Sequence, residues 1–324
     1  MAQYDFMLSR RGMIAGAALG LTGAAPIAPI NTSGDQVGDR LDTSDFIEPR
    51  FTAQFDTLPI FARGVVRPQL PRPLTDPAFE WNAGYIHAKR SPGVPDYVAH
   101  GRPIPAFSAL SSELAIYPNG DAIELSRYSP FSIERGTLVI TAAHTPAAIR
   151  PLIPETFAQD YVSGAINSYP FSQTYGYFEL RGRLPAGRGL WPAFWLMPVD
   201  MSWPPEIDVM EVLGQEPTRI FTTVHSKRFA SGTQIGFGTR TLDLSADDHL
   251  FGVDWGPERI RFYVDRRLVF SQPTPEDCRK PFYIIANLAV GGPTSWPHAP
   301  DETTPFPAHF RIASIRAWQR EHYQ

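Results

Sequence analysis

The sequence has a single cysteine, Cys278, which excludes an internal disulfide framework and any zinc site built from several cysteines. It also lacks an excess of charge of one sign, because 29 Lys and Arg stand against 33 Asp and Glu, for a net charge of −4. No basic field therefore favours nucleic acid as a partner, and no acidic run is typical of a solvating tail. Charged residues are only 19 % and hydrophobic residues 43 % of the 324 residues, which argues against disorder and for a large core.

Proline is abundant, with 33 residues, and this argues against a helical bundle because proline breaks helix interiors. Short runs of alternating apolar and polar residues recur instead, separated by Gly, Pro, Asp or Asn. In residues 177–181, for example, Phe178 and Leu180 share one face of an expected strand. Residues 264–268 are typical of a hairpin turn between two strands. The pattern predicts an all-β protein, a sandwich or jelly roll with its core between two sheets.

The N-terminal segment is typical of an export signal. Arg10 and Arg11 precede a mildly apolar stretch, residues 15–25, which is too short for the ~20 residues that a bilayer crossing needs. We interpret residues 1–44 as a twin-arginine signal peptide and linker, and residues 45–324 as one catalytic domain. The expected location is the periplasm or the extracellular space, with no membrane anchor after cleavage. The alternative is a mobile extension with a chance arginine pair.

One motif concentrates acidic side chains in a strand-like run. Glu206, Asp208 and Glu211 occur within six residues, among Ile, Val and Met. On a regular strand Glu206 and Asp208 share one face, whereas Glu211 falls on the other. All three can share a face only if the strand accommodates one extra residue, which predicts a β-bulge around residues 209–210.

The chemistry of glycoside cleavage gives a reason for this arrangement. Cleavage with retention uses two carboxyl groups about 5–5.5 Å apart, one attacking the anomeric carbon and one protonating the leaving oxygen. Asp208 between the two glutamates adds like charge, which in general raises a carboxyl pKa and favours a protonated acid. The alternative is that the three acids are simply the solvated face of a half-buried strand.

Three tryptophans just upstream favour the catalytic interpretation. Trp191, Trp195 and Trp203 precede the acidic motif, and large aromatic side chains seek either burial or a ligand. Aromatic faces bind the apolar side of a pyranose ring. Packing in the core is the alternative role for each tryptophan.

With these segments in view, the sequence resembles glycoside hydrolase family 16, whose members include laminarinases, lichenases and enzymes of algal galactans. The form with an extra residue before the last glutamate is similar to the bulged, laminarinase-like branch. Matching segments extend from about Phe51 to Trp318 and include residues 175–181, 189–196, 203–214, 251–255 and 287–292.

The resemblance implies a concanavalin A-like β-sandwich jelly roll, with two curved antiparallel sheets and a concave substrate cleft. It also implies a retaining mechanism in which Glu206 is the nucleophile, Glu211 the acid/base and Asp208 an electrostatic helper. Members often carry one structural calcium far from the cleft, so the resemblance extends to a calcium ion whose ligands the sequence does not assign. No cofactor is expected for catalysis.

The substrate-binding residues follow from the same resemblance. Trp203 matches a tryptophan that stacks on sugar on the donor side, Trp195 an aromatic of the cleft floor, and Asn287 a cleft asparagine. His225 matches a residue that contacts the sugar near the acid/base, and Trp191 is expected to bind substrate as well. Surface exposure is the alternative for the histidine, and structural hydrogen bonding for the asparagine.

The expected function is therefore endo-hydrolysis of a polysaccharide, either a β-1,3-glucan or a mixed 1,3-1,4-glucan. The chain departs from characterised β-glucanases at Ala165 and Asn167, where these enzymes carry a charged residue at one of the two positions. A bacterial exopolysaccharide is the alternative substrate. Two alternatives of another class are a non-catalytic carbohydrate-binding jelly roll and a carboxylate-rich metal hydrolase. The protein is expected to be a monomer, with neither nucleic acid nor membrane as partner.

Overall fold

The computed structural model describes most of the chain after Gln36. The described ranges are 37–55, 81–85, 96–99, 102–105, 107–108, 113–119, 123, 127–147, 149–153, 160–169, 171–230 and 232–323. The predicted signal peptide lies largely outside these residues. Within them, no helix reaches the length and hydropathy that a bilayer crossing requires.

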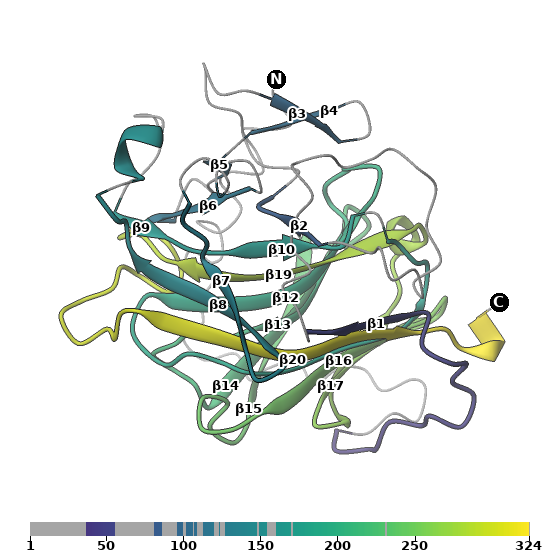
Figure 1. Ribbon diagram of the computed structural model, residues 1–324. Helices are drawn as coiled ribbons and strands as arrows, with labels where there is room; N and C mark the ends of the chain where they lie inside the picture. The colour runs from purple at the N-terminus through teal and green to yellow at the C-terminus, as the bar shows by residue number, and fades with distance from the viewer. Residues whose placement is uncertain are drawn as a thin grey trace.

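The first and larger layer is an eleven-stranded sheet, in which β9 and β6 form a parallel pair while the other pairs are antiparallel (Figure 1). Its main path runs through β18 (Arg267–Pro273), β17 (Arg259–Val264), β16 (His249–Trp255), β11 (Gly176–Arg183), β20 (Ala308–Trp318), β8 (Thr137–His144), β9 (Tyr161–Val162), β6 (Ala115–Pro118) and β5 (Phe107–Ser108). Off this path, β1 (Phe51–Gln54) pairs with β20 and β7 (Phe131–Glu134) pairs with β8.

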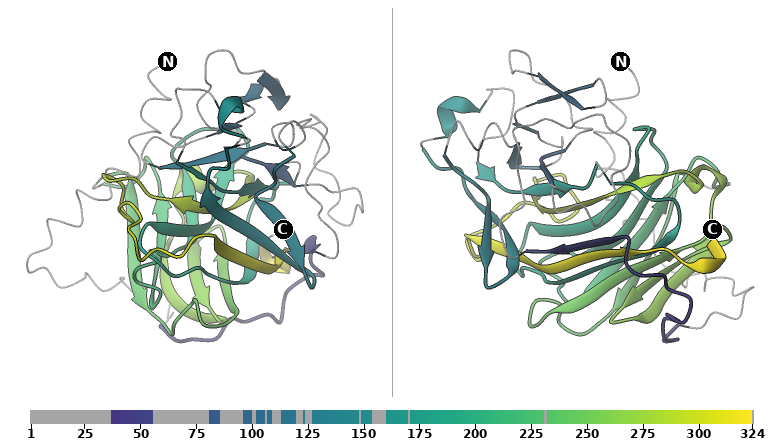
Figure 2. Two further views of the ribbon diagram at one scale, coloured as in Figure 1. Left: turned by 60° about the vertical axis from the view of Figure 1, so that its left-hand side comes forward. Right: turned by 45° about the vertical axis from the view of Figure 1, so that its right-hand side comes forward.

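The second layer is a seven-stranded antiparallel sheet that stacks on the first, and both sheets are curved (Figure 2). Its order is β15 (Gln234–Arg240), β14 (Arg219–His225), β13 (Glu206–Glu211), β12 (Leu190–Pro198), β19 (Phe282–Val290), β10 (Ala165–Asn167) and β2 (Asn82–Ala83). A separate hairpin joins β3 (Asp96–Ala99) to β4 (Arg102–Pro105), and three short 3₁₀ helices cover Arg150–Leu152, Glu276–Cys278 and Glu321–Tyr323.

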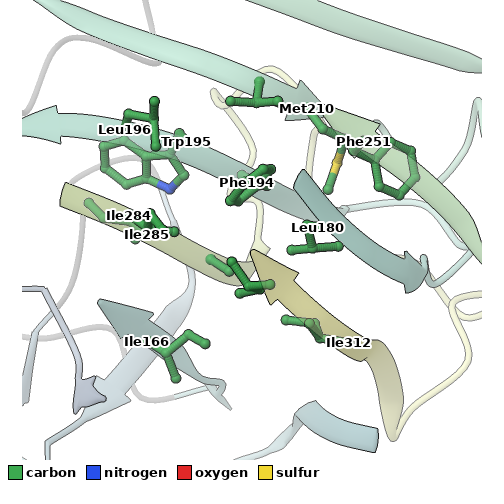
Figure 3. Packing of buried hydrophobic residues seen from close by; sticks show 14 of the residues in the cluster. Ile166, Leu180, Phe194, Trp195, Leu196, Met210, Phe251, Ile284, Ile285 and Ile312 are labelled. Carbon is green, nitrogen blue, oxygen red and sulfur yellow. The ribbon is translucent and has the colours of Figure 1, made fainter. Parts of the chain in front are cut away.

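The core lies between the two sheets, as the alternation of apolar residues predicts. Phe194 and Met210 come from the seven-stranded sheet, and Leu180, Phe251 and Ile312 come from the larger one (Figure 3). All five side chains are fully buried. Successive residues of a strand point to opposite faces. Because Phe194 and Met210 point into the core, their neighbours along β12 and β13 lie on the other face of the sheet.

The all-β sandwich is confirmed, and so is the hairpin turn at residues 264–268. Asp265 and Arg266 join β17 to β18 with φ of 49° and 59°. Two consecutive residues with positive φ match the right-handed twist of a two-residue hairpin. Residues 38–41, placed in the expected linker, bond to the same hairpin through Gly38 N to Leu268 O (2.8 Å) and Leu41 N to Arg266 O (2.9 Å).

Candidate active site

Strand β13 contains a bulge. On its β12 side, Asp208 lies opposite Trp195 and Met210 lies opposite Phe194, so Val209 is an extra residue between two consecutive partners. The same irregularity appears toward β14, where the register shifts between Asp208 and Glu211. The predicted bulge at residues 209–210 is thus confirmed.

The bulge brings the three acids to one face of the seven-stranded sheet. Opposite Glu206, Asp208 and Glu211 on β14 are His225, Thr223 and Phe221, which alternate along a regular strand. We call this surface the site face, defined by these six residues; it is the face turned away from the other sheet. Ile207 and Met210 point into the core instead.

The three carboxylates are almost fully removed from bulk water. Glu206, Asp208 and Glu211 are 5 %, 4 % and 5 % exposed. His225 Nε2 lies 3.0 Å from Asp208 Oδ2 and 3.7 Å from Glu206 Oε1, and the histidine is itself buried. A charge-assisted hydrogen bond of this kind orients both partners. The site therefore contains an imidazole held between two acids, one of them the expected nucleophile.

His225 is brought to the acids by strand pairing. The resemblance implies that it contacts the sugar near the acid/base, and this stays a prediction; the register places it opposite Glu206. Its contact with Asp208 and Glu206 does not follow from the spacing of these residues in the sequence. Seventeen residues separate His225 from Asp208, and only the antiparallel pairing of β13 and β14 brings them together.

Trp195 and Asn287 form a second polar contact next to the acids. Trp195 Nε1 donates a hydrogen bond of 2.8 Å to Asn287 Oδ1. The register places Trp195 opposite Asp208, but its ring is only 2 % exposed, and the ring of Tyr85 lies 6.1 Å away. The indole and the amide fix one another in a buried position on the strands next to β13, and a role in the cleft floor stays a prediction.

Trp203 lies beside the other ring of the site. Its ring centroid is 6.0 Å from that of His225, at an interplanar angle of 45°. The side chain is 6 % exposed and packs against the main core cluster. Trp203 therefore packs in the core and also lies beside the imidazole that contacts Glu206 and Asp208.

A third aromatic group lies toward the Glu211 end of the site face. Trp191 is fully buried and meets Trp296 edge to face, with ring centroids 5.6 Å apart. Trp296 is only half-buried and also meets Phe221 edge to face, at 4.5 Å. Neither Trp296 nor Phe221 is among the residues that the sequence predicts for the site. The one available signal for Trp296 was its setting between Ser295 and Pro297, similar to Trp203 before its prolines.

The two positions that depart from characterised β-glucanases lie at the far side of the same sheet. Asn167 is fully buried and its amide is satisfied by protein groups, since Nδ2 donates to Gly84 O at 2.9 Å and Oδ1 accepts from Tyr169 N at 3.2 Å. Ala165 pairs with Asn287 across β10 and β19. A neutral amide thus occupies a place where a charged side chain would have to be buried.

Glu206, Asp208 and His225 are also the one group of potential metal ligands brought together within the described part of the chain. Their ligand atoms all lie within 4.8 Å of one another. The hydrogen bond between His225 and Asp208 accounts for this closeness. Calcium prefers six to eight oxygen ligands, so a set that includes an imidazole does not suit it. The structural calcium stays a prediction.

Comparisons with known proteins identify a matching family and several relatives. The sequence profile of glycosyl hydrolases family 16 matches residues 126–305. Endo-1,3-1,4-beta-glycanase EglC of Rhizobium meliloti is 43 % identical over 183 residues, which cover 56 % of this chain and 38 % of that protein. Beta-glucanase of Rhodothermus marinus is 35 % identical over 222 residues, covering 60 % of this chain and 74 % of that protein.

A solved structure has a similar fold. The catalytic domain of an endo-1,3-beta-glucanase (laminarinase) from Thermotoga petrophila RKU-1 superimposes with a TM-score of 0.62 at 26 % identity, covering 88 % of this chain and all of that chain. The chain spans about two fifths of the length of EglC, so similarity to that relative concerns one part of it.

Proposed function

Because the chain belongs to glycosyl hydrolases family 16, we propose that it is an endo-acting glycosidase that cleaves internal β-1,3- or mixed β-1,3-1,4-glucosidic bonds with retention. One observation carries the proposal: the bulge in β13 places Glu206, Asp208 and Glu211 on one face of a curved sheet. A strand whose acids were merely solvated would have no need of the bulge and would not bury all three carboxylates.

Each acid has a distinct role in the proposed mechanism. The Glu206 carboxylate attacks the anomeric carbon, and Glu211, in its protonated form, gives its proton to the leaving oxygen. Glu211 then removes a proton from water, which attacks the anomeric carbon and releases Glu206. Asp208 accepts a hydrogen bond from His225, which lies 3.7 Å from Glu206, and thereby fixes the geometry around the nucleophile.

The substrate is proposed from the relatives. EglC is named an endo-1,3-1,4-beta-glycanase, and the Rhodothermus marinus relative a beta-glucanase. A glucan with 1,3- or mixed linkages is therefore the first substrate to test. A bacterial exopolysaccharide with β-linked glucose is the alternative. We also propose that residues 1–44 direct export by the twin-arginine route and that the exported enzyme is a monomer.

The proposal is tested by reducing-end release from laminarin, lichenan, agar, carrageenan and bacterial exopolysaccharides. NMR of the first product must show the β-anomer if the configuration is retained. Glu206→Gln and Glu211→Gln should each abolish turnover while leaving thermal unfolding close to that of the wild type. Glu258→Gln, which replaces an exposed acid far from the motif, is the matched control and should leave turnover unchanged.

Azide separates the two roles. On an activated aryl glucoside with a good leaving group, Glu211→Ala with azide should form the β-glycosyl azide, because azide replaces water in the second step. Glu206→Ala with azide should instead form the α-glycosyl azide in a single inversion. An exchange of these two products would reverse the assignments. Binding of glucan without turnover by the wild type would leave the non-catalytic carbohydrate-binding module as the explanation.

A further inference from the structure

The site face continues beyond Glu211 into a pair of arginines. Along β14, Phe221 lies opposite Glu211, and Arg219 follows two residues further on, about 7 Å along the strand. Arg219 lies opposite Arg240 of β15, the edge strand of the same sheet. Because Phe221, Thr223 and His225 alternate on the site face, Arg219 and its partner belong to this face too.

Arg219 is held in place by its neighbours. Its guanidinium carbon lies 5.0 Å from the centroid of the Phe221 ring, a cation–π distance. The guanidinium also lies across Gly238, where a Cβ would come within 2.9 Å of Arg219 Nε. Phe221 in turn contacts Trp296, which contacts Trp191. Phe221 therefore lies between Glu211 and Arg219 on the site face, supported by the rings of Trp296 and Trp191.

Within the described part of the chain, the two arginines share a single acidic partner. Like charges directly opposite each other in a sheet are destabilising. The one acid paired with them among the described residues is Glu216, 3.8 Å from Arg219, and both side chains are about half exposed at 49 % and 47 %. An exposed ion pair of this kind contributes little to stability. The pair thus keeps a net positive charge beside a pocket of about 450 Å³ lined by Glu216, Thr218, Arg219, Arg240 and Thr241.

We propose that Arg219 and Arg240 bind an anionic substituent of the polysaccharide, a carboxylate or a sulfate ester, on the leaving-group side of the cleaved bond. The planar donors of guanidinium match both groups, and the ligand's charge removes the repulsion between the two arginines. The leaving-group side follows from the position next to Glu211, the proposed acid/base. The inference rests on the proposed function and deepens it, since it makes an acidic polysaccharide the preferred substrate.

The test compares laminarin with two derivatives of the same laminarin, one oxidised to carry C6 carboxylates and one partly sulfated. The wild type should cleave at least one derivative with a kcat/KM about tenfold above that for neutral laminarin, and this preference should fall as salt screens the charges. Arg219→Gln and Arg240→Gln should each reduce the preference about tenfold. Arg181→Gln removes an arginine of the other sheet that is 57 % exposed, and it should leave the preference unchanged.

The outcomes separate the two proposals. Equal losses on neutral and anionic substrates in Arg219→Gln and Arg240→Gln would overturn the anion site while leaving the glucanase intact. If the wild type cleaved none of the three, calorimetric binding of carboxylated and sulfated laminarin oligosaccharides would still decide the inference. Binding that Arg240→Gln weakens more than Arg181→Gln does supports the anion site, and binding indifferent to both substitutions rejects it.

Discussion

His225 Nε2 lies 3.0 Å from Asp208 Oδ2 and 3.7 Å from Glu206 Oε1, so one buried imidazole contacts two of the three acids on the site face. The histidine comes from β14 and the acids from β13, and the pairing of Glu206 with His225 fixes their approach. The ring of Trp203 lies beside the imidazole, with the two centroids 6.0 Å apart. His225 is thereby suited to hold Asp208 and Glu206 at a constant separation.

Substitution of His225 tests this positioning role. His225→Ala removes the common partner of Asp208 and Glu206, so the two carboxylates lose their fixed position and kcat should fall about 100-fold. His225→Gln keeps a donor of similar reach and should recover part of the loss. The substitution should change kcat and the pH profile of kcat/KM. A change in KM alone, at constant kcat, would show that His225 only contacts substrate.

The bulge makes a second prediction, because its extra residue can be removed. Deleting Val209 leaves Glu206, Asp208 and the final glutamate in strict alternation, which keeps all three on one face of a regular strand. If the bulge at Val209 is kept, inserting an alanine between Met210 and Glu211 instead moves the glutamate toward the core. The deletion should retain measurable hydrolysis of glucan, whereas the insertion should abolish it and lower the melting temperature.

The matched control for this pair is Val209→Ala, which keeps the chain length and should retain the bulge. Reducing-end assays and thermal unfolding of the three variants suffice for the comparison. If the deletion and the insertion variants were equally inactive and equally stable, activity would not depend on the three acids sharing one face of β13.

The acids and the bulge could be predicted from the sequence because both depend on local spacing. The parity of residues 206, 208 and 211 and the chemistry of paired carboxylates point to the same irregularity of a strand. The sandwich was predictable for a similar reason. Apolar and polar residues alternate in segments such as residues 177–181, and the many prolines argue against helical folds.

The surroundings of the acids could not be predicted, because they depend on pairing between distant segments. Contact of His225 with Glu206 requires the register of β14, and the cover over Trp195 comes from Tyr85, far away in sequence. Trp296 joins Trp191 and Phe221 from a loop with no periodic pattern. Only the fold shows which of the tryptophans are buried.

Because of Tyr177, we expect the free energy of unfolding to fall at alkaline pH. Burial first, and the neighbouring Glu179 second, raise the pKa of this phenol well above its usual 10.0. The folded state therefore keeps the phenol proton at a pH where the unfolded chain releases it. This contribution is fully present below pH 10 and is lost as the pH rises through the folded-state pKa.

Tyr177→Phe removes the titrating group together with the 2.9 Å hydrogen bond to Glu179. At neutral pH the variant should lose about 1 kcal/mol of unfolding free energy. Between pH 9 and pH 11 its stability should fall less steeply than that of the wild type, measured by urea unfolding at each pH. Parallel curves for the two proteins would show that Tyr177 ionises as readily in the folded as in the unfolded chain.

Arg320 anchors the C-terminal end of the chain to the larger sheet. Its Nε and Nη2 donate to the two oxygens of Asp254 at 2.8 and 3.1 Å, and both side chains are buried. Arg320→Met removes both of these hydrogen bonds and the nearer cation from the buried Asp254 carboxylate and leaves it Arg261, at 4.0 Å, as its cationic partner, so it should cost about 3 kcal/mol of unfolding free energy. The control is Arg228→Met, which breaks a 3.2 Å pair with Glu276 between side chains 60 % and 73 % exposed and should cost under about 1 kcal/mol. The double variant Asp254→Asn with Arg320→Met should be more stable than Arg320→Met alone, because it removes a buried charge that has lost its hydrogen-bonded partner. Urea unfolding of the wild type, Arg320→Met, Asp254→Asn and the double variant measures the coupling. A double variant no more stable than Arg320→Met would show that Arg320 acts through its packing over Phe46 and its contact with Asp45 instead.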